Sequence, residues 1–263
     1  MSTALSVNVN KIALLRNSRE GNYPNVLAFA QQAIDSGAQG ITVHPRPDQR
    51  HIRPDDVYAL NALVAEQPKA EFNIEGNPFE AADQPVGSSS AAIHYPGFMA
   101  LVEKTRPHQA TLVPDNQAQL TSDHGFDLLK DGEKLRPIIQ QLRQWNVRVS
   151  LFMDPDIKQI EQAKKLGADR IELYTGPYAA NFGSEKAAET LSTYRAAALY
   201  AHDIGLGINA GHDLNLLNLP EFLAIANITE VSIGHALTVD ALIMGYKNTV
   251  AAYSKICELS YTR

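Results

Sequence analysis

Hydrophobic positions along the chain gather into short runs that alternate with longer segments of mixed polarity. The short runs are nearly continuous in apolar residues, which is typical of strands in a parallel sheet covered by helices. They lie at residues 5–10, 40–44, 71–75, 109–113, 147–153, 170–174, 206–210 and 230–234. The segments between them have helical patterns. These predict helices at about 24–36, 54–66, 96–105, 134–145, 156–166, 184–204, 215–226 and 239–258.

Glycines mark several of the changes from helix to strand. The stretches IDSGAQGITV, KKLGADRIEL and HDIGLGIN each place a glycine between a helical pattern and the next apolar run. Glycine takes the left-handed conformation that ends a helix. The alternation of strand and helix over 263 residues predicts an α/β fold, a (β/α)8 TIM barrel, with residues 1–263 forming a single domain. A doubly wound open sheet is the alternative, but no G-x-G-x-x-G motif follows the first run.

Composition and charge exclude several classes of protein. A net charge of -6 and a pI near 5.7 argue against general binding to nucleic acid or to membrane surfaces. The single cysteine, Cys257, cannot form an internal disulfide, which fits a reducing cytoplasm. No basic flank precedes a long apolar run at the start, and no run approaches the roughly 20 apolar residues of a membrane helix. We therefore expect a cytoplasmic, soluble protein without a signal peptide.

Within this acidic chain, one strand runs directly into a cationic loop. The stretch GITVHPRPDQRHIRP, residues 40–54, begins as a buried strand and then presents His44, Arg46, Arg50, His51 and Arg53. Catalytic sites of such barrels lie at the carboxyl ends of the strands. Guanidinium groups suit phosphate oxygens, and prolines reduce the entropy lost when the loop is ordered. The loop predicts a binding site for a small anion, while a solvated surface turn is the alternative for Arg50 and Arg53.

Other strand ends carry groups suited to phosphate binding and proton transfer. NAGHD and SIGHA end the last two strands, so His212 and His235 each follow a glycine where barrel enzymes often hold a phosphate. Packed, hydrogen-bonded histidines are the alternative. Glu75 and Glu172 end apolar strands, where burial raises the pKa of a carboxyl group towards the range of a general base. Pairing with a nearby cation is the alternative for either carboxylate.

Other kinds of catalytic chemistry lack their usual motifs. His44, Glu75, His212 and His235 resemble a set of metal ligands, but no His-x-His pair occurs in the chain. There is no G-x-S-x-G motif, and Cys257 falls in the last predicted helix, where a packed thiol is expected. We expect neither a metal nor a cofactor.

Together, the motifs resemble those of a known enzyme family. VNVNKIALLRNSR, GITVHPRPDQRHI, FNIEG, TLVPD, VSLFMDPD, IELYTG, INAGHDL and SIGHAL follow one another along nearly the whole chain. In this order they resemble pyridoxine 5′-phosphate synthase, a transferase-type synthase of vitamin B6 biosynthesis. The resemblance implies a TIM barrel with additional helices, assembled as a homo-octamer of dimers. It also implies condensation of 3-amino-2-oxopropyl phosphate with 1-deoxy-D-xylulose 5-phosphate, two phosphorylated substrates, with release of phosphate and water.

The resemblance also implies a role for individual residues. His44 and Glu75 would accept protons, His212 would donate one, and Glu172 would stabilise a transition state. The deoxyxylulose phosphate would contact Asn8, Arg46, His51 and Thr121, and the amino-ketone phosphate would contact Arg19, Gly234 and His235. No redox cofactor or metal is implied.

The chain departs from the family pattern at several positions of the site. Asn10 and Lys11 stand where many members have Asp and His, Tyr174 replaces a frequent histidine, and Asp213 follows His212 where glycine is common. Asn10 keeps hydrogen bonding without charge, and Lys11 supplies a permanent cation. We expect Asn10, Lys11 and Asp213 to remain in contact with substrate. For Asp213 the alternative is that it turns away from a bound phosphate, which would repel it, and caps the next helix.

Two long connections also depart from the usual lengths. Residues 77–96 after the third strand exceed the usual two to six residues, and we interpret them as a loop insertion. Residues 115–133 contain Thr121, and we predict that they close over bound substrate.

Two other functions remain open from the sequence. One is another phosphosugar barrel, an aldolase or isomerase, although the sixth strand ends in Glu172 and Tyr174 and not in a Schiff-base lysine. The other is a non-catalytic phosphosugar-binding paralogue. Retention of His44, Glu75 and His212 favours an enzyme, because simple binding has no use for three proton-transfer groups.

Overall fold

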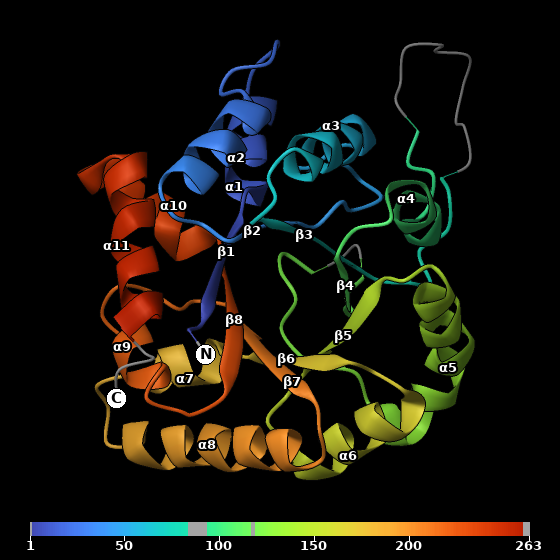
Figure 1. Cartoon of the computed structure of the whole chain (residues 1–263), viewed down its shortest axis with the longest axis vertical. Coiled ribbons are helices and arrows are strands. Elements are labelled where there is room, and N and C mark those ends of the chain that lie inside the picture. The colour runs from blue at the N-terminus through green and yellow to red at the C-terminus, as the bar shows by residue number, and fades with distance from the viewer. Residues whose placement is uncertain (1, 84–93, 117–118, 260–263) are drawn as a thin grey trace.

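Eight parallel strands close into a barrel in the computed structural model of the chain, which describes residues 2–83, 94–116 and 119–259 (Figure 1). Each strand pairs with its neighbours in sequence, and β8 pairs with β1 to close the ring. The predicted (β/α)8 fold is therefore confirmed. The strands are β1 (Ala4–Asn8), β2 (Gly40–Val43), β3 (Glu71–Gly76), β4 (Gln109–Leu112), β5 (Arg148–Met153), β6 (Arg170–Tyr174), β7 (Gly207–Gly211) and β8 (Ile228–Ile233).

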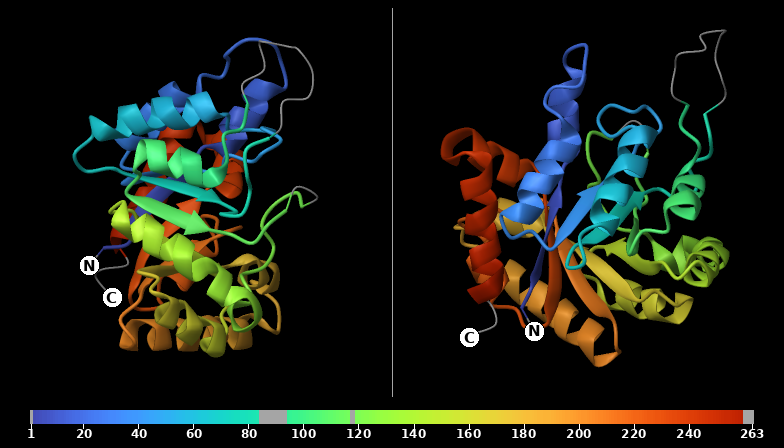
Figure 2. Two further views of the ribbon diagram at one scale, coloured as in Figure 1. Left: turned by 90° about the vertical axis from the view of Figure 1, so that its right-hand side faces the viewer. Right: turned by 45° about the horizontal axis from the view of Figure 1, so that its top comes forward.

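Helices surround the barrel and cover its outer surface (Figures 1 and 2). The last helix lies beside the first strand, so the two ends of the described chain meet in space. The helices are α1 (Asn10–Asn17), α2 (Val26–Asp35), α3 (Pro54–Ala65), α4 (Phe98–Thr105), α5 (Leu128–Gln144), α6 (Ile157–Leu166), α7 (Gly176–Asn181), α8 (Ala187–Asp203), α9 (Leu219–Phe222), α10 (His235–Met244) and α11 (Tyr246–Leu259).

Most predicted elements are present, but several boundaries were wrong. The first strand ends at Asn8, because the Asn8 side chain accepts a hydrogen bond from the Asn10 backbone N–H and the chain turns into α1. The predicted helix 239–258 is two helices, since Gly245 has a φ of 77° that a continuous helix cannot contain. The predicted helix 215–226 is reduced to α9, and α5 begins earlier than predicted.

The glycines predicted to end helices do so. Gly37, Gly167 and Gly205 have φ values of 107°, 95° and 77°, and each lies between a helix and the following strand. A side chain at these backbone angles is strained, so glycine allows the short helix-to-strand turns. Short turns at this end of the barrel leave the longer connections to the opposite end, where the strands finish.

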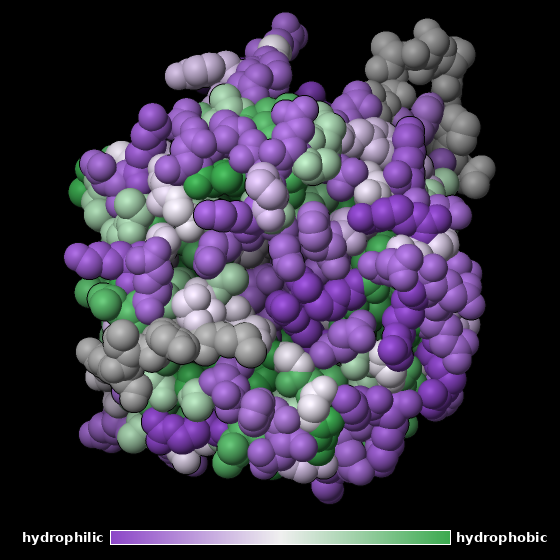
Figure 3. Space-filling model, viewed as in Figure 1, coloured by the Kyte–Doolittle hydropathy of each residue, from purple (hydrophilic) through white to green (hydrophobic). Residues whose placement is uncertain are grey.

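The inner face of the barrel is unusually polar. Strand side chains alternate between two faces, and residues such as Ile41 pack in the hydrophobic core with the helices. The alternate positions are hydrogen-bonded to one another across strands: Ser6 to Thr42 at 2.7 Å, and Thr111 to Asn73 at 3.1 Å. Carboxylates on the same inner face of β3 and β6 are therefore held inside the barrel. The face seen in Figure 3 is mostly hydrophilic, with hydrophobic side chains in scattered patches.

The connection after β3 falls partly outside the described residues. Of the predicted insertion 77–96, residues 84–93 are not described. Its two ends lie together, because the Asp83 backbone N–H donates to the Tyr95 carbonyl at 3.1 Å and Ala81 bridges to Gly97. Among the helices of the described residues, none has the length and apolar character needed to cross a membrane.

Candidate active site

The carboxyl ends of the strands surround a pocket of about 460 Å³. Residues from distant parts of the sequence line it, because a closed barrel brings all strand ends to one rim. Its lining includes every predicted site residue except Arg19: Asn8, Asn10, Lys11, His44, Arg46, His51, Glu75, Thr121, Glu172, His212, Asp213, Gly234 and His235.

His44 and Glu75 lie side by side at the ends of neighbouring strands. Nδ1 of His44 is 3.9 Å from Oε2 of Glu75. Asn8 and Ser232 each donate to a Glu75 oxygen at 3.4 Å. Burial raises the pKa of Glu75 to about 8, although the Ser232 hydroxyl opposes this. Burial lowers the pKa of His44 well below its ordinary value, and the Arg46 cation lowers it further. Burial therefore favours the protonated form of Glu75 and the neutral form of His44.

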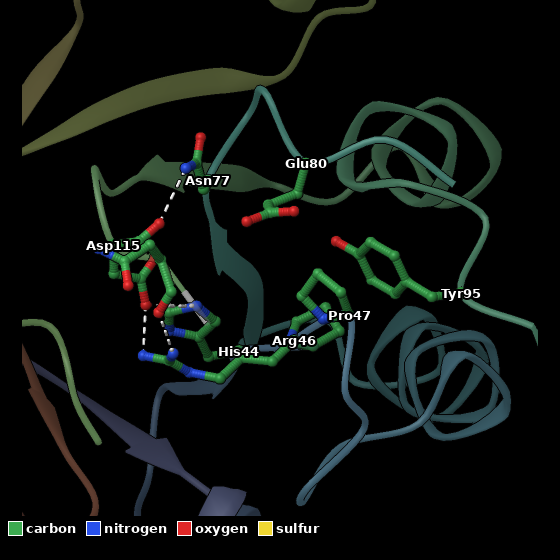
Figure 4. Close-up of a pocket in the computed structure, with 9 residues that line it drawn as sticks. His44, Arg46, Pro47, Asn77, Glu80, Tyr95 and Asp115 are labelled. Carbon is green, nitrogen blue, oxygen red and sulfur yellow. Dashed lines mark hydrogen bonds and ion pairs between the residues drawn. The ribbon is translucent and has the colours of Figure 1, made fainter. Parts of the chain in front are cut away.

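Asp115 lies on the other side of His44. Its Oδ2 is 3.4 Å from Nε2 of His44 and pairs closely with the Arg46 guanidinium. Figure 4 shows the Asp115 carboxylate facing both groups, with the Asn77 amide donating to the Asp115 carbonyl at 2.8 Å. A small cavity of about 10 Å³ adjoins these residues, and His44 and Arg46 line both it and the main pocket. This volume is about that of one water site.

The cationic loop after β2 is held by residues of α1. Buried Arg16 donates to the His51 carbonyl at 3.1 Å and to the Asp56 carboxylate at 2.8 Å, and Asn17 also donates to the His51 carbonyl. The Ile52 backbone N–H donates to Nδ1 of His51 at 2.9 Å, so a neutral His51 carries its proton on Nε2. Burial lowers the pKa of His51 to about 3. His51 thus presents a neutral N–H donor.

Glu172 is almost fully buried in the barrel, in the middle of β6. Its Oε2 has no hydrogen-bond partner among the described residues. Burial raises the pKa of Glu172 well above its ordinary value, and the neighbouring Glu75 raises it further. Gly211 leaves space for this carboxylate, because a Cβ atom there would lie 2.4 Å from Oε1 of Glu172.

His212 projects from a strained turn after β7. Its φ of 86° is uncommon for a residue with a side chain, and the Thr175 hydroxyl donates to its backbone carbonyl. The ring lies 5.1 Å from that of Phe152 and 5.3 Å from that of Tyr174, and Nε2 is 3.1 Å from the Thr121 hydroxyl. Burial lowers the pKa of His212 to about 4, with Asp213 and Asp115 opposing.

Because the Thr121 hydroxyl contacts His212, the loop that carries Thr121 already reaches across the pocket. Residues 117–118 of this loop lie outside the described part of the chain, and closure of 115–133 over a substrate remains a prediction.

Gly234 and His235 form the start of α10 directly after β8. Position 234 packs against β1, since a Cβ atom there would lie 3.0 Å from Cβ of Asn8. Helix α10 begins at His235, so the backbone N–H groups of its first turn lie at the pocket rim. An exposed helix N-terminus at a strand end favours a bound anion.

Among the positions that depart from the family pattern, Asn10 has a clear structural contact. Its side-chain oxygen accepts a hydrogen bond from the His44 backbone N–H at 2.9 Å, which fixes the end of β2 against α1. Lys11 and Asp213 both reach the pocket lining. Arg19 does not: α1 carries the chain away from the rim, and the exposed Arg19 guanidinium donates to the Ser18 carbonyl at 2.8 Å. Its role in phosphate binding remains a prediction.

Comparison with known proteins identifies the family of the chain. The family described as pyridoxal phosphate biosynthesis protein PdxJ matches residues 5–259. A pyridoxine 5′-phosphate synthase of Xanthomonas campestris pv. campestris (strain B100) is 55% identical over 257 residues, covering 97% of this chain and 96% of the relative. The chain belongs to the PdxJ family. A synthase of the same name from Xylella fastidiosa (strain 9a5c) is 52% identical, and the alignment covers 97% of this chain and 95% of that relative.

Solved structures that are distant in sequence share the fold of this PdxJ member. One is that of the Amycolatopsis orientalis BexX/CysO complex, with a TM-score of 0.62 at 13% identity, covering 99% of this chain and 90% of the other. Phosphoribosyl anthranilate isomerase from Thermus thermophilus gives a TM-score of 0.55 at 15% identity, covering 99% of this chain and 100% of the isomerase chain. At these identities the likeness supports the barrel alone.

Family membership makes this chain a biosynthetic enzyme, and the resemblance drawn from its motifs is confirmed.

The sequence analysis missed some residues of the site. Asp115 and Ser232 were given no role, although both contact the predicted proton-transfer residues. The position of Asp115 shortly after a predicted strand was the sequence feature that could have identified it as a site residue. Across the described residues, no three His, Cys, Asp or Glu side chains are arranged to hold a metal ion.

Proposed function

We propose that this PdxJ enzyme condenses 3-amino-2-oxopropyl phosphate with 1-deoxy-D-xylulose 5-phosphate to give pyridoxine 5′-phosphate, phosphate and water. Its relatives are named for that product. The observation that carries the proposal is the meeting of His44, Glu75 and His212 around one pocket with cations in its lining. Such a pocket combines proton transfer with recognition of negatively charged reactants.

The pocket offers two phosphate sites of different character. Arg46 provides a guanidinium and His51 a neutral N–H donor, and we assign the deoxyxylulose phosphate to them together with Asn8 and Thr121. The N-terminus of α10, at Gly234 and His235, suits the amino-ketone phosphate, with Arg19 as a further contact that the family resemblance implies. Separate sites would hold two anions in one pocket and align the amine with the sugar ketone.

Proton transfer then depends on the different proton affinities of His44 and Glu75. In the resting pair the proton is on Glu75, so neutral His44 accepts the first proton from carbon next to the new imine. Glu75 gives its proton to the hydroxyl group that leaves as water when the imine forms, and the resulting carboxylate then serves as a second base. Each such step is a proton transfer next to a carbonyl or imine, for which imidazole and carboxylate groups are suited.

The remaining steps use His212 and Glu172. The amine attacks the sugar ketone and forms an imine, an enol follows, phosphate leaves, water adds, and an aldol-type closure with dehydration gives the ring. His212 donates a proton to a leaving oxygen, and a nearby phosphate dianion would raise its pKa for that purpose. Glu172 gives its proton to the imine nitrogen beside it, which forms the iminium cation, and the opposite charge then favours the carboxylate. The ionised carboxylate then stabilises that cation.

The test is to mix both phosphorylated substrates with purified protein and follow pyridoxine 5′-phosphate by its ultraviolet absorbance, with released phosphate measured in parallel. We expect turnover by the wild type and a loss of about 10²- to 10⁴-fold in His44→Ala and Glu75→Gln. Glu133→Gln, on the exposed surface of α5, is the matched control for removal of a carboxylate. Binding of both substrates without product would contradict the proposal and indicate a non-catalytic paralogue.

We also propose that the chain assembles as a homo-octamer built from dimers, as the family resemblance implies. Large apolar side chains on α1 and α10 support assembly, because Leu15 is 56% exposed, Leu242 81% and Ile243 86% in the single chain. Light scattering coupled to size-exclusion chromatography measures the mass directly. A monomeric mass would contradict this proposal without affecting the chemistry proposed for the pocket.

A further inference from the structure

Asp115 is a buried carboxylate to which the sequence assigns no role. It follows β4 and is 5% exposed. Its Oδ2 contacts the Arg46 guanidinium, lies 3.4 Å from Nε2 of His44, and accepts from the Ser122 hydroxyl at 3.3 Å. The Asn77 amide holds its backbone carbonyl. The carboxylate is therefore fixed by contacts from the loops after β2 and β4, and the backbone of Asp115 by a contact from the loop after β3.

The two ring nitrogens of His44 face different surroundings. Nδ1 faces Glu75, a residue of the large pocket, at 3.9 Å. Nε2 faces Asp115, which lines the small cavity and not the large one. A neutral imidazole has one nitrogen with a proton and one with a lone pair. His44 can accept a proton from substrate only if Nδ1 has the lone pair, and Nε2 must then carry the proton.

We propose that Asp115 is a positioning residue that holds the proton of His44 on Nε2 and so leaves Nδ1 as the base facing the substrate. The arrangement has the logic of a catalytic triad, in which a buried carboxylate fixes the tautomer of a histidine. A separation of 3.4 Å closes to a hydrogen bond with a small adjustment, as is common when a substrate binds. The catalytic part of this inference rests on the proposed function.

Two alternatives give different outcomes. Burial raises the pKa of Asp115, with the Arg46 cation opposing. A protonated Asp115 would donate to Nε2 and place the His44 proton on Nδ1. Alternatively, Asp115 acts only by orienting Arg46, which also donates to the carbonyls of Asn116 and Gln119 at 3.2 Å. In that case its loss would weaken substrate binding and leave the tautomer of His44 unchanged.

The tautomer can be read directly, without substrates, by nitrogen NMR of protein labelled with ¹⁵N-histidine. The His44 signals are assigned by their absence in His44→Gln. We expect the wild type to carry its proton on Nε2, and Asp115→Ala to show a mixture of both tautomers. Asp115→Asn retains an acceptor oxygen and should keep the Nε2 proton. A wild-type proton on Nδ1, or an unchanged tautomer in Asp115→Ala, overturns the proposal.

Kinetics provide the second readout. We expect kcat to fall about 10²-fold in Asp115→Ala and about tenfold in Asp115→Asn, with KM for the sugar phosphate changed less than about threefold. Asp35→Asn is the control: Asp35 accepts a hydrogen bond from Gln31 at 2.8 Å on α2, but is exposed and outside the pocket lining. Unchanged kcat with raised KM overturns the proposal, because Asp115 would then act through Arg46.

The two readouts separate this inference from the proposed function. If the wild type forms no pyridoxine 5′-phosphate, the proposed function fails while the NMR result still decides the role of Asp115. If Asp115→Ala does not fold, the wild-type tautomer and the kcat of Asp115→Asn decide the question. A wild-type proton on Nδ1, or an unchanged kcat with raised KM in Asp115→Asn, then overturns the proposal.

Discussion

A Cβ atom at position 211 would lie 2.4 Å from Oε1 of Glu172 on the neighbouring strand. Gly211 therefore determines where this buried carboxylate sits, although it contributes no side chain of its own. In Gly211→Ala the new methyl group meets the flexible end of Glu172, so the carboxylate must move while the strand remains in place. We expect kcat to fall at least tenfold and stability to fall by about 1–3 kcal/mol.

Gly207→Ala is the matched control for this substitution. Gly207 begins the same strand at the opposite end of the barrel, where a Cβ atom would meet the Arg170 side chain at 2.7 Å. It should show a similar loss of stability with wild-type kcat. Equal activity losses in both variants would indicate a general effect of alanine in β7. Chemical denaturation and steady-state kinetics on the same preparations distinguish the two results.

Glu75 should make the stability of the fold depend on pH. Its pKa rises from an ordinary 4.5 to about 8 in the folded chain, because of burial. Between these values the folded state retains a proton that the unfolded state releases, so the contribution of Glu75 to stability falls as pH rises from about 5 to 8. Glu75→Gln cannot titrate. The free energy of unfolding of the wild type relative to this variant should therefore decline across that range, by a few kcal/mol.

Urea unfolding at a series of pH values measures this difference. The exposed Glu133→Gln variant should follow the wild type at every pH, within about 0.5 kcal/mol. A wild-type curve parallel to that of Glu75→Gln would mean that Glu75 titrates normally and is not held in its protonated form.

The sequence predicted the barrel and most of the pocket because both depend on local patterns. Strand periodicity places His44 and Glu75 at carboxyl ends and Glu172 inside β6, and ring closure then brings them together whatever the details of the loops. Asp115 was missed because its role depends on which nitrogen of His44 it faces, a relationship across loops that no local pattern encodes. Arg19 came from the family resemblance, and its role in phosphate binding stays a prediction, because α1, which the strand pattern did not predict, carries Arg19 away from the pocket lining.

The buried ion pair of Arg16 and Asp56 should hold the cationic loop after β2 in place and stabilise the fold. Arg16 is 2% exposed and bonds both Asp56 and the His51 carbonyl, so it ties the loop to α3. Arg16→Met leaves Asp56 buried without its cation, and we expect a loss of about 3–5 kcal/mol. Arg16→Met/Asp56→Asn removes both charges and should recover part of that loss. Denaturant unfolding of the single and double variants tests the coupling, which additive losses would contradict.

Thr175 should position His212 through its hydroxyl group alone. The single hydrogen of this fully buried hydroxyl is shared between the backbone carbonyls of Gly211, at 2.6 Å, and of His212, whose φ of 86° needs support from its surroundings. Thr175→Val keeps the shape and removes the hydroxyl donor; the Gly211 carbonyl retains the Thr175 backbone N–H at 2.9 Å, while the His212 carbonyl loses its contact, at a cost of about 1–3 kcal/mol. We expect kcat to fall more than KM changes, because His212 no longer meets the leaving group at a fixed position.

Thr175→Ser retains the hydroxyl and should restore most of the activity. If Thr175→Val and Thr175→Ser lose activity equally, packing of the methyl group holds the turn, and the hydroxyl has no part in placing His212.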